Sequence, residues 1–192
     1  MSAAGTAWWF VRHGESVANA GGWLSGWDDV PLTQRGEAEA RARADAVAAL
    51  PIRRCLTSDL QRARATAVGL LAHRPDVPIH VDAGLRERNL GVFQGRPLAE
   101  AGEPEARRLL RSWRVAPPGG ESHEELVARA LATLRRWDDG SPTLVVAHGA
   151  LIRDLLGVLD GRAPDDFLQD AATANVALHP RVAELATLRP RD

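Results

Sequence analysis

Residues 7–14 read AWWFVRHG, and residues 142–149 read PTLVVAHG. Each segment is a short, continuous apolar run that ends at a His-Gly pair, and such runs are typical of strands buried on both faces of a parallel sheet. His13 and His148 therefore each follow a strand, and the glycine after each allows the chain to turn into the next element. If the two strands are neighbours, the imidazoles meet at the sheet edge where open parallel sheets bind ligands.

Strand and helix signals alternate along the rest of the chain. Strands are expected at 8–11, 52–58, 78–82 and 143–147, and helices at 33–50, 58–73, near 98–113, 122–137, 150–159 and near 165–170. The stretch 175–188 is expected to form two strands around a turn at His179-Pro180, a C-terminal hairpin at or near the sheet edge. This alternation predicts an α/β fold of three layers, α/β/α, with a mostly parallel central sheet. No repeat or linker interrupts it, so we expect one domain over residues 1–192.

The composition limits the function. The chain has 192 residues, is 45% hydrophobic and carries a formal net charge of -1, which argues against nucleic acid or a membrane surface as a partner. A lone Cys55 excludes an internal disulfide and a multi-cysteine metal site. No apolar stretch approaches the ~20 residues of a membrane span, and the N-terminal segment does not resemble a signal peptide. We therefore expect a cytoplasmic protein.

Arginines accompany the two histidines at the predicted strand ends. Arg12 precedes His13 and offers a planar fork of donors that suits a phosphate or a carboxylate. Ser58 and Gln61 have the spacing of a capping box, which places Arg62 just beyond the first turn of a helix whose N-terminus favours anions. Two arginines and two histidines at three strand ends predict an anion site, and phosphoryl is the best candidate anion.

Such a site suits phosphoryl transfer. A neutral imidazole can attack phosphorus and form a phosphohistidine that water later hydrolyses. The leaving alkoxide then needs a proton donor, commonly a carboxylic acid. Glu87 follows the third predicted strand and is a candidate, although a carboxylate between Arg86 and Arg88 is equally an ordinary ion-pair partner. A single histidine after a strand is likewise more often structural than catalytic, but here the context occurs twice.

Five segments in order carry a family resemblance. They are VRHGESVAN (11–19), SGWDDVPLTQRGEAEA (25–40), TSDLQRARATA (57–67), LRERNLG (85–91) and VVAHGALIR (145–153). Together they resemble the signatures of the histidine phosphatase superfamily, in the branch that contains cofactor-dependent phosphoglycerate mutases and many small-molecule phosphatases. The resemblance spans the chain to about residue 153 and implies a phosphoglycerate mutase-like fold.

The resemblance also implies roles for eight residues. By position, His13 is the phosphorylated nucleophile, Arg12, Arg62 and His148 hold the phosphoryl oxygens, Glu87 is the proton donor, Asn19 hydrogen-bonds the phosphoryl group, and Ser25 and Gly26 line the substrate entrance. The family needs no metal, and the sequence has no Cys, His and carboxylate cluster at ligand spacing.

Phosphatase and mutase remain the two main alternatives. A mutase must shield its phosphoenzyme from water, and family mutases carry a longer insertion after the proton-donor motif, an adjacent arginine pair and a C-terminal tail. Here the region 92–120 is compact, the chain ends soon after the last predicted strand, and Arg107-Arg108 falls on the solvated face of a predicted helix. The sequences of the segments SGWDDVPLT and ERNLG are closer to those of the mutases. We expect a phosphatase of a small soluble phosphomonoester, with no cofactor; a mutase would use 2,3-bisphosphoglycerate.

Other classes fit less well. A non-catalytic binding module would have lost one of the five residues that the resemblance makes catalytic, and a serine hydrolase would need a G-x-S-x-G elbow, which is absent from the chain. A metal site on the two histidines would be sensitive to chelator. His123, in the GGES segment, is a candidate substrate contact, and a homodimer through the final hairpin is compatible with the pattern. Trp23, Trp27, Phe93 and Trp113 are expected to line the pocket or fill the core.

Overall fold

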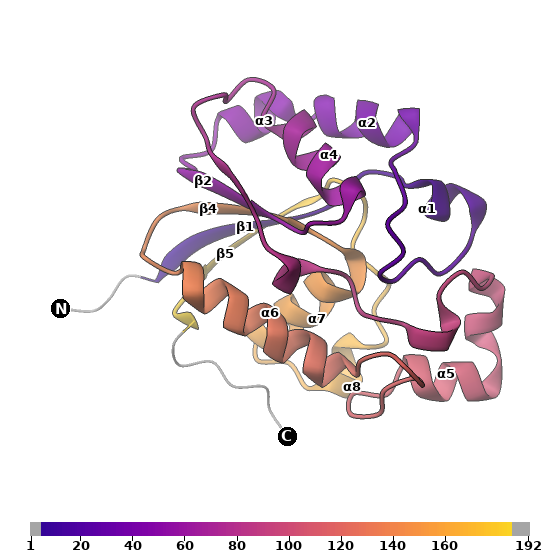
Figure 1. The fold of residues 1–192 in the computed structure, drawn as a ribbon. Helices are drawn as coiled ribbons and strands as arrows, with labels where there is room; N and C mark the ends of the chain where they lie inside the picture. Colours follow the sequence, from indigo (N-terminus) through magenta and orange to yellow (C-terminus); the bar gives the residue numbers. More distant parts are fainter. Residues whose placement is uncertain (1–4, 186–192) are drawn as a thin grey trace.

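The central sheet has five strands and is mostly parallel. The computed structural model describes residues 5–185. Its strands are β1 (Thr6–Arg12), β2 (Arg54–Thr57), β3 (Ile79–Val81), β4 (Thr143–Ala147) and β5 (Leu178–Ala183). They lie in the order β3-β2-β4-β1-β5, and only β5 runs antiparallel to its neighbour, β1 (Figure 1). The predicted α/β fold with a mostly parallel sheet is therefore confirmed.

The two strands that lead to the histidines are neighbours. In the parallel pair of β1 and β4, Arg12 lies opposite Ala147. The N–H of His13 continues this ladder and donates to the carbonyl of Ala147 at 3.0 Å. His13 and His148 thus leave the sheet side by side, at the carboxyl ends of adjacent strands.

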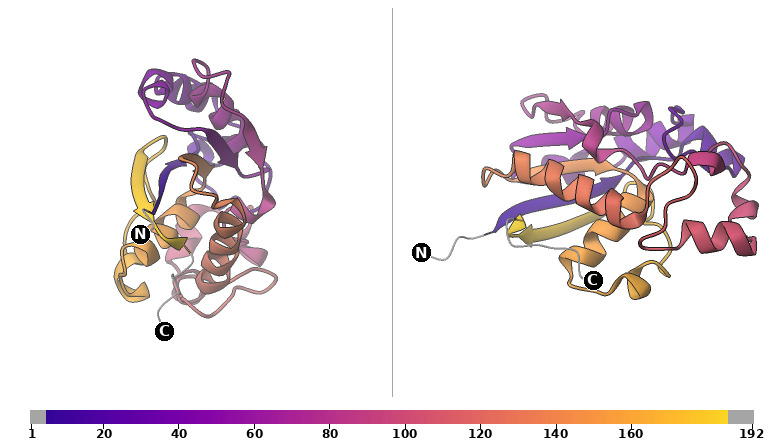
Figure 2. Two further views of the ribbon diagram at one scale, coloured as in Figure 1. Left: turned by 90° about the vertical axis from the view of Figure 1, so that its left-hand side faces the viewer. Right: turned by 60° about the horizontal axis from the view of Figure 1, so that its bottom comes forward.

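Helices cover both faces of the sheet (Figures 1 and 2). One face is covered by α2 (Gln34–Arg41), α3 (Ala44–Ala48) and α4 (Gln61–Leu70), and the other by α6 (His123–Trp137), α7 (Gly149–Leu159) and α8 (Pro164–Phe167). Alternate residues of β1 serve the two cores: Trp8 and Phe10 pack in the core with α6 and α7, whereas Val11 packs in the core with α3 and α4. This alternation follows from the two-residue period of a strand. Within the described residues, no helix is long and apolar enough to cross a membrane.

A separate group of short elements lies beyond the carboxyl ends of the strands. It contains α1 (Val17–Gly21), η2 (Gly91–Phe93), η3 (Leu98–Gly102) and α5 (Pro104–Leu110), while η1 (Ala83–Leu85) joins β3 to the loop that leads there (Figure 1). We call residues 90–111 the wall. The wall has its own small apolar cluster of Phe93, Ala106 and Leu109, distinct from the two cores on the sheet.

Two predicted helices differ from the structure. The helix expected at 33–50 is divided into α2 and α3 by a turn, although Thr33 caps it as predicted by accepting from the N–H of Gly36. The capping box of Ser58 and Gln61 is wrong. The N–H of Ser58 bonds the carbonyl of Val146 and so extends the β2–β4 ladder, and α4 begins only at Gln61. Arg62 is therefore inside the first turn rather than beyond it.

The predicted turn at His179-Pro180 is also wrong. Strand β5 runs straight through both residues, and Pro180 lies opposite Trp9 in the antiparallel pair with β1. Proline is tolerated there because β5 is an edge strand, whose residues need not all donate to a ladder. The expected second strand begins inside β5, which continues to Ala183, and its last residues, 186–188, lie outside the described residues. The helix expected near 98–113 is η3 followed by α5, which begins at Pro104.

Candidate active site

His13 is fixed with one ring nitrogen engaged. Its Nδ1 lies 2.7 Å from the carbonyl oxygen of Gly14, and a carbonyl only accepts, so Nδ1 carries the hydrogen and Nε2 carries the lone pair. The side chain is 4% exposed. Behind it, the N–H of Gly14 donates to the hydroxyl of Thr66 at 3.0 Å. The imidazole is thus held in the tautomer that a nucleophile needs.

His148 lies beside His13 but is held differently. It is the N-cap residue of α7 and is fully buried, with its ring centroid 5.2 Å from that of His13. Neither of its ring nitrogens has a hydrogen-bond partner among the described residues. Buried polar atoms without a partner are rare and costly in folded proteins. Two such atoms next to His13 indicate a binding site in which a polar ligand supplies the missing hydrogen-bond partners.

Two buried guanidinium groups accompany the histidines. Arg62, in the first turn of α4, is 1% exposed and donates to the carbonyls of Gly26 and Asp28, both at 2.8 Å. Arg12, the last residue of β1, donates through Nη1 to the carbonyl of Thr173 at 2.8 Å. In both side chains Nε is buried without a partner among the described residues. Loops on two sides of the sheet edge therefore anchor the arginines and leave donors for a ligand.

The electrostatics of this group favour an anion. Burial, and then the charges of Arg62 and Arg12, hold the pKa of His13 well below its ordinary 6.5. Burial and Arg62 do the same to the pKa of His148. Burial also lowers the pKa of both arginines, while the charge of Glu87 raises it. At pH 7 the imidazoles are neutral and the guanidiniums are charged, which suits a phosphoryl dianion approaching a neutral nucleophile.

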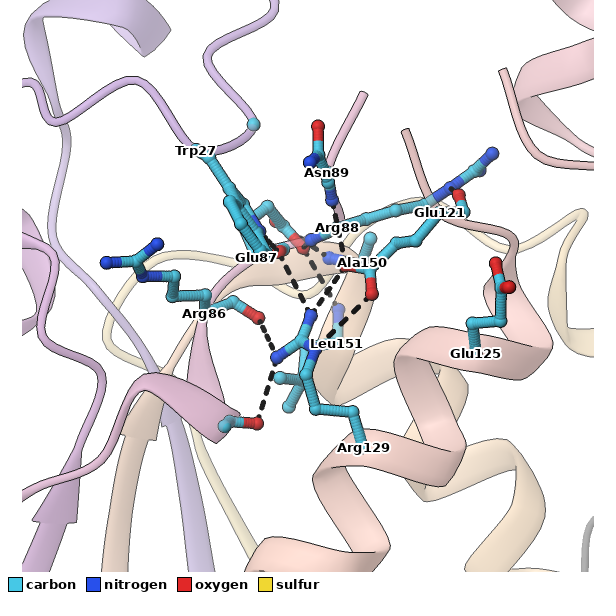
Figure 3. Close-up of polar contacts among 12 residues, drawn as sticks. Trp27, Arg86, Glu87, Arg88, Asn89, Glu121, Glu125, Arg129, Ala150 and Leu151 are labelled. Atoms are coloured by element: carbon cyan, nitrogen blue, oxygen red, sulfur yellow. Dashed lines mark hydrogen bonds and ion pairs between the residues drawn. The ribbon is translucent and has the colours of Figure 1, made fainter. Parts of the chain in front are cut away.

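Glu87 lies at the N-terminus of α7 (Figure 3). Its Oε1 accepts from the N–H groups of Arg88 (2.9 Å) and Leu151 (3.2 Å), and its Oε2 accepts from the N–H of Ala150 (3.2 Å). The half-buried carboxyl group also lines the cavity beside the arginines. It is thus fixed to the helix that His148 caps.

The flanking arginines of Glu87 have other partners. Arg86 makes a bidentate ion pair with Asp59, with Nε 2.8 Å from Oδ1. Arg88 is buried and donates to the carbonyls of Leu109, Leu110 and Glu121 and contacts His123. The interpretation of Glu87 as an ion-pair partner of Arg86 and Arg88 is therefore wrong.

A cavity of about 820 Å³ opens from the site toward the wall. The predicted binding residues Asn19, Ser25 and Gly26 line it together with Arg12 and Glu87. His13, Arg62 and His148 are buried and do not line it. The remaining lining is mixed, with apolar side chains of Trp23, Leu24, Leu90, Leu98, Leu110 and Leu168 and the cations Arg107, Arg111 and Arg153. Arg107 thus borders the cavity, which corrects its predicted place on a purely solvated face, while the exposed Arg108 pairs with Glu105.

His123 also lines this cavity, but its ring nitrogens are engaged. Its Nδ1 lies 2.5 Å from Oδ2 of the fully buried Asp154, and its Nε2 contacts Arg88 and the carbonyl of Leu110. This pairing supports a structural role in the wall of the cavity. Within residues 5–185, no three His, Cys, Asp or Glu side chains gather in a way that could hold a metal ion.

Sequence reasoning missed the residues that hold the backbone at Glu87. Trp27 was expected only to line the pocket or fill the core, yet its Nε1 donates to the carbonyl of Glu87 at 2.7 Å. Arg129 and Glu121 also bond this segment. Arg129 is one of several arginines on an amphipathic helix, so no sequence signal distinguishes it. The GGES segment, which contains Glu121, was the one available hint.

The match to known proteins agrees with this geometry. A family model described as the histidine phosphatase superfamily, branch 1, matches residues 8–182. The match covers most of the chain, and the chain belongs to this superfamily.

Relatives within the superfamily carry two kinds of name. The chain is 39% identical over 166 residues to 2,3-bisphosphoglycerate-dependent phosphoglycerate mutase 2 of Gloeobacter violaceus, covering 81% of this chain and 76% of the relative. It is 41% identical to the corresponding mutase of a Methylobacterium species, covering 79% of each. Among solved structures, a mycobacterial glucosyl-3-phosphoglycerate phosphatase is 30% identical with a TM-score of 0.80, covering 91% of this chain and 89% of the other. These two sequence relatives are thus named mutases, whereas this solved structure is a phosphatase.

Proposed function

We propose that this protein is a metal-independent phosphomonoesterase that acts through a covalent phosphohistidine on His13. The observation that carries the proposal is the hydrogen bond from Nδ1 of His13 to the carbonyl of Gly14, because it leaves the Nε2 lone pair available for attack. Two buried guanidiniums and the unpartnered nitrogens of His148 surround this atom's ring and suit the phosphoryl oxygens.

The first half of the reaction transfers the phosphoryl group to the protein. Arg12, Arg62 and His148 hold the oxygens, and Asn19 adds a contact from the cavity side. Nε2 of His13 forms a bond to phosphorus while the bond from phosphorus to the ester oxygen breaks. The carboxyl group of Glu87 gives its proton to that oxygen, so the alcohol leaves neutral and Glu87 is left as a carboxylate. The Nδ1–H bond to Gly14 stabilises the positive ring.

The second half returns the protein to its starting state. Water from the cavity attacks phosphorus, and the carboxylate of Glu87 takes a proton from it. The N–P bond breaks, the electron pair returns to Nε2 of His13, and inorganic phosphate leaves. Each cycle therefore consumes one phosphomonoester and one water, yields one alcohol and one phosphate, and restores the proton on Glu87.

The size of the cavity supports hydrolysis of the phosphoenzyme over transfer of its phosphoryl group to another hydroxyl, as a mutase would carry out. A volume of about 820 Å³ lies within the range of sites that enclose drug-sized ligands. A three-carbon phosphoester would leave much of that space to water, which hydrolysis requires and a mutase must exclude. We therefore propose a phosphorylated metabolite with a sizeable organic part as the substrate. Inorganic phosphate and VO3 bind the mycobacterial phosphatase, whose structures with them have TM-scores of 0.81 and 0.84 to this chain, and both are useful probes here.

Phosphoglycerate mutase is the second candidate. Relatives at 39–41% identity carry that name, and Arg107, Arg111 and Arg153 give the cavity cations for a substrate carboxylate. In this alternative 2,3-bisphosphoglycerate would phosphorylate His13, and the phosphoryl group would return to a substrate hydroxyl instead of water.

One pair of assays separates the candidates. Phosphate release from p-nitrophenyl phosphate and a panel of phosphorylated metabolites is measured with a chelator present, beside 3-phosphoglycerate isomerisation with and without 2,3-bisphosphoglycerate. Chelator-resistant hydrolysis that is lost in His13→Ala supports the phosphatase. Isomerisation that far outpaces phosphate release supports the mutase, and inactivity in both assays contradicts both candidates.

A further inference from the structure

The backbone carbonyl of Glu87 accepts hydrogen bonds from two side chains of distant elements (Figure 3). Nε1 of Trp27 donates to it at 2.7 Å from the loop after α1, and Nη2 of Arg129 donates at 3.3 Å from α6. Neither side chain is needed to bind a phosphoryl group. Their convergence on one carbonyl therefore points to a role for them in placing the side chain of the same residue.

Arg129 bonds more of the segment than this one carbonyl. Its Nη1 donates to the carbonyls of Gly84 (2.9 Å) and Arg86 (3.2 Å). Its fork also pairs with Glu121, with Nη2 2.6 Å from Oε1 and Nε 3.3 Å from Oε2. One guanidinium thus spans three carbonyls between residues 84 and 87 and is itself held by a carboxylate. A planar fork with five N–H donors can satisfy such a set, whereas an ammonium group cannot.

Glu121 extends the support to the other side of Glu87. Its Oε1 accepts from the N–H of Asn89 at 2.8 Å, and its own N–H donates to the carbonyl of Asn89 at 3.0 Å. The ring of Trp27 also contacts two cations, with the guanidinium carbons of Arg86 and Arg129 at 4.9 Å and 5.9 Å from its centroid. The backbone on both sides of Glu87 is therefore fixed to α6 and to the loop of Trp27.

The loop that contains Trp27 also holds Arg62. Gly26 and Asp28, the neighbours of Trp27, provide the two carbonyls that hold Arg62. Trp27 thus links the segment that orients the phosphoryl-binding guanidinium to the segment that carries the carboxyl group. A fixed distance between these two groups matters because a proton donor must meet the leaving oxygen while the phosphoryl group is held.

We infer that Arg129, supported by Glu121 and acting with Trp27, is a positioning residue that keeps the carboxyl group of Glu87 at the leaving-group oxygen. The inference rests on the proposed function. Without Arg129 the carbonyls of Gly84 and Arg86 lose their guanidinium donor, and the carbonyl of Glu87 keeps only the hydrogen bond from Trp27. Small rotations of this backbone would then move the carboxyl group relative to the phosphoryl site. The loss falls on the proton donation step and leaves attack by His13 intact.

The test compares Arg129→Met with Arg74→Met. Arg74 is a matched control, because it also pairs with a carboxylate, Asp76, and donates to two carbonyls, those of Leu50 and Ile52, at the amino end of β2. Its side chain is 22% exposed and that of Arg129 is 23% exposed. A decrease in kcat/KM that reflects only the loss of an ion pair and of hydrogen bonds to carbonyls should be similar in the two variants.

The readout is the dependence of kcat/KM on the leaving group. In Arg129→Met we expect kcat/KM to fall by about 30- to 100-fold for alkyl phosphates, which need a proton donor, and by less than about threefold for p-nitrophenyl phosphate, which does not. Arg74→Met should change both by less than about twofold. Equal losses for the two kinds of substrate in Arg129→Met would overturn the inference.

Three further variants sharpen the result. Adding Arg129→Met to Glu87→Gln should lower alkyl phosphate hydrolysis by less than about threefold more, because both changes remove one function. Arg129→Lys keeps the charge but not the fork, so it should restore only a small part of the activity, and full restoration would overturn positioning in favour of a field effect. Trp27→Phe keeps an aromatic ring but removes the N–H donor. It should lower kcat/KM for alkyl phosphates more than for p-nitrophenyl phosphate, as Arg129→Met does, but by a smaller factor.

Failure of the proposed function is recognised separately. Wild-type protein that releases no phosphate from any substrate overturns the phosphatase, and positioning is then read from hydrogen exchange. Amides of residues 85–90 should exchange at least about tenfold faster in Arg129→Met than in wild type and remain unchanged in Arg74→Met. Unchanged exchange in both variants would overturn the inference without reference to activity.

Discussion

His13 and His148 occupy equivalent places in the fold and have different surroundings. Each follows a buried strand by one residue, each precedes a glycine, and the strands are parallel neighbours. His13 donates from Nδ1 to the next carbonyl and presents a defined lone pair. His148 has neither nitrogen bonded within the described residues, although it is fully buried. In the proposed mechanism, His13 attacks phosphorus and His148 binds the phosphoryl oxygens.

The difference shows that a repeated sequence pattern determines where a residue lies in the fold. The neighbours of that residue then determine its role. The glycines after the two histidines differ in the same way. A Cβ on Gly14 would lie 2.4 Å from the backbone oxygen of Gly36, whereas a Cβ on Gly149 would lie 3.1 Å from a Cβ of Ala172 and 3.2 Å from Nε of Arg12. The His13 side is packed against backbone, and the His148 side against a functional side chain.

The largest difference should come from His13→Ala. Under the proposed function this change removes the nucleophile, so it should abolish the phosphoenzyme and lower kcat/KM by at least about 10⁴-fold, as for other enzymes that lose their nucleophile. Intact-protein mass spectrometry after alkaline quench measures the phosphoenzyme directly. A variant that still gains one phosphoryl group would show that the two histidines are interchangeable.

His148→Ala should be slower than wild type but still form phospho-His13. Loss of one group that stabilises transferring oxygens commonly costs about 10²- to 10³-fold in rate. The burst of p-nitrophenol in a rapid-mixing experiment reports the first step. Loss of the phosphoenzyme as complete as in His13→Ala would contradict the division of roles.

The glycine pair gives a stability comparison. Gly14→Ala should lower the free energy of unfolding by about 1–3 kcal/mol, since backbone on both sides must shift. Gly149→Ala should cost less than about 1 kcal/mol, because its neighbours are side chains and alanine favours the helix that begins there. The latter should instead raise KM by displacing Arg12. Urea unfolding of both variants beside steady-state kinetics measures each effect, and equal destabilisation would contradict this reasoning.

A further comparison concerns the pH dependence of stability. Burial and the nearby arginines hold the pKa of both histidines well below 6.5, so below that pH the unfolded chain binds protons that the folded protein does not. The free energy of unfolding should therefore fall with decreasing pH by about 1.4 kcal/mol per pH unit for each histidine, until the folded-state pKa is reached. His148→Gln should reduce the slope by about that amount. Urea unfolding between pH 7.5 and 5 tests this, and an unchanged slope would place the titration elsewhere.

Much of the fold, and the meeting of His13 and His148 at the sheet edge, could be predicted from the sequence. Continuous apolar runs predict the strands of a buried sheet, and His-Gly pairs after two of them predict the meeting of the histidines. The start of α4 could not be predicted, because Ser58 extends a ladder with β4 that depends on tertiary pairing. Likewise Pro180 looks like a turn residue locally, and only its edge position lets β5 continue.

The parts of the site that escaped prediction are contacts to backbone carbonyls. Arg62, Arg88 and Arg129 are all held by main-chain oxygens of segments far away in sequence, and any residue type supplies such an oxygen. Side-chain identity therefore carries no signal for them. Glu87 was found because its neighbours matched a family pattern, but its bonds to Ala150 and Leu151 depend on where α7 begins.

The separate apolar cluster of the wall has a consequence for engineering and for evolutionary divergence. Phe93, Ala106 and Leu109 pack with each other rather than with either core of the sheet. Exchange of residues 90–111 for the corresponding segment of a relative should therefore leave both cores of the sheet intact, provided that the new segment keeps the two carbonyls, those of Leu109 and Leu110, that hold the buried Arg88. Arg12, His13, Arg62, Glu87 and His148 are carried by other elements, whereas Arg107 and Arg111 belong to the wall. A chimera of this kind should therefore keep the proposed chemistry and acquire a new choice of substrate.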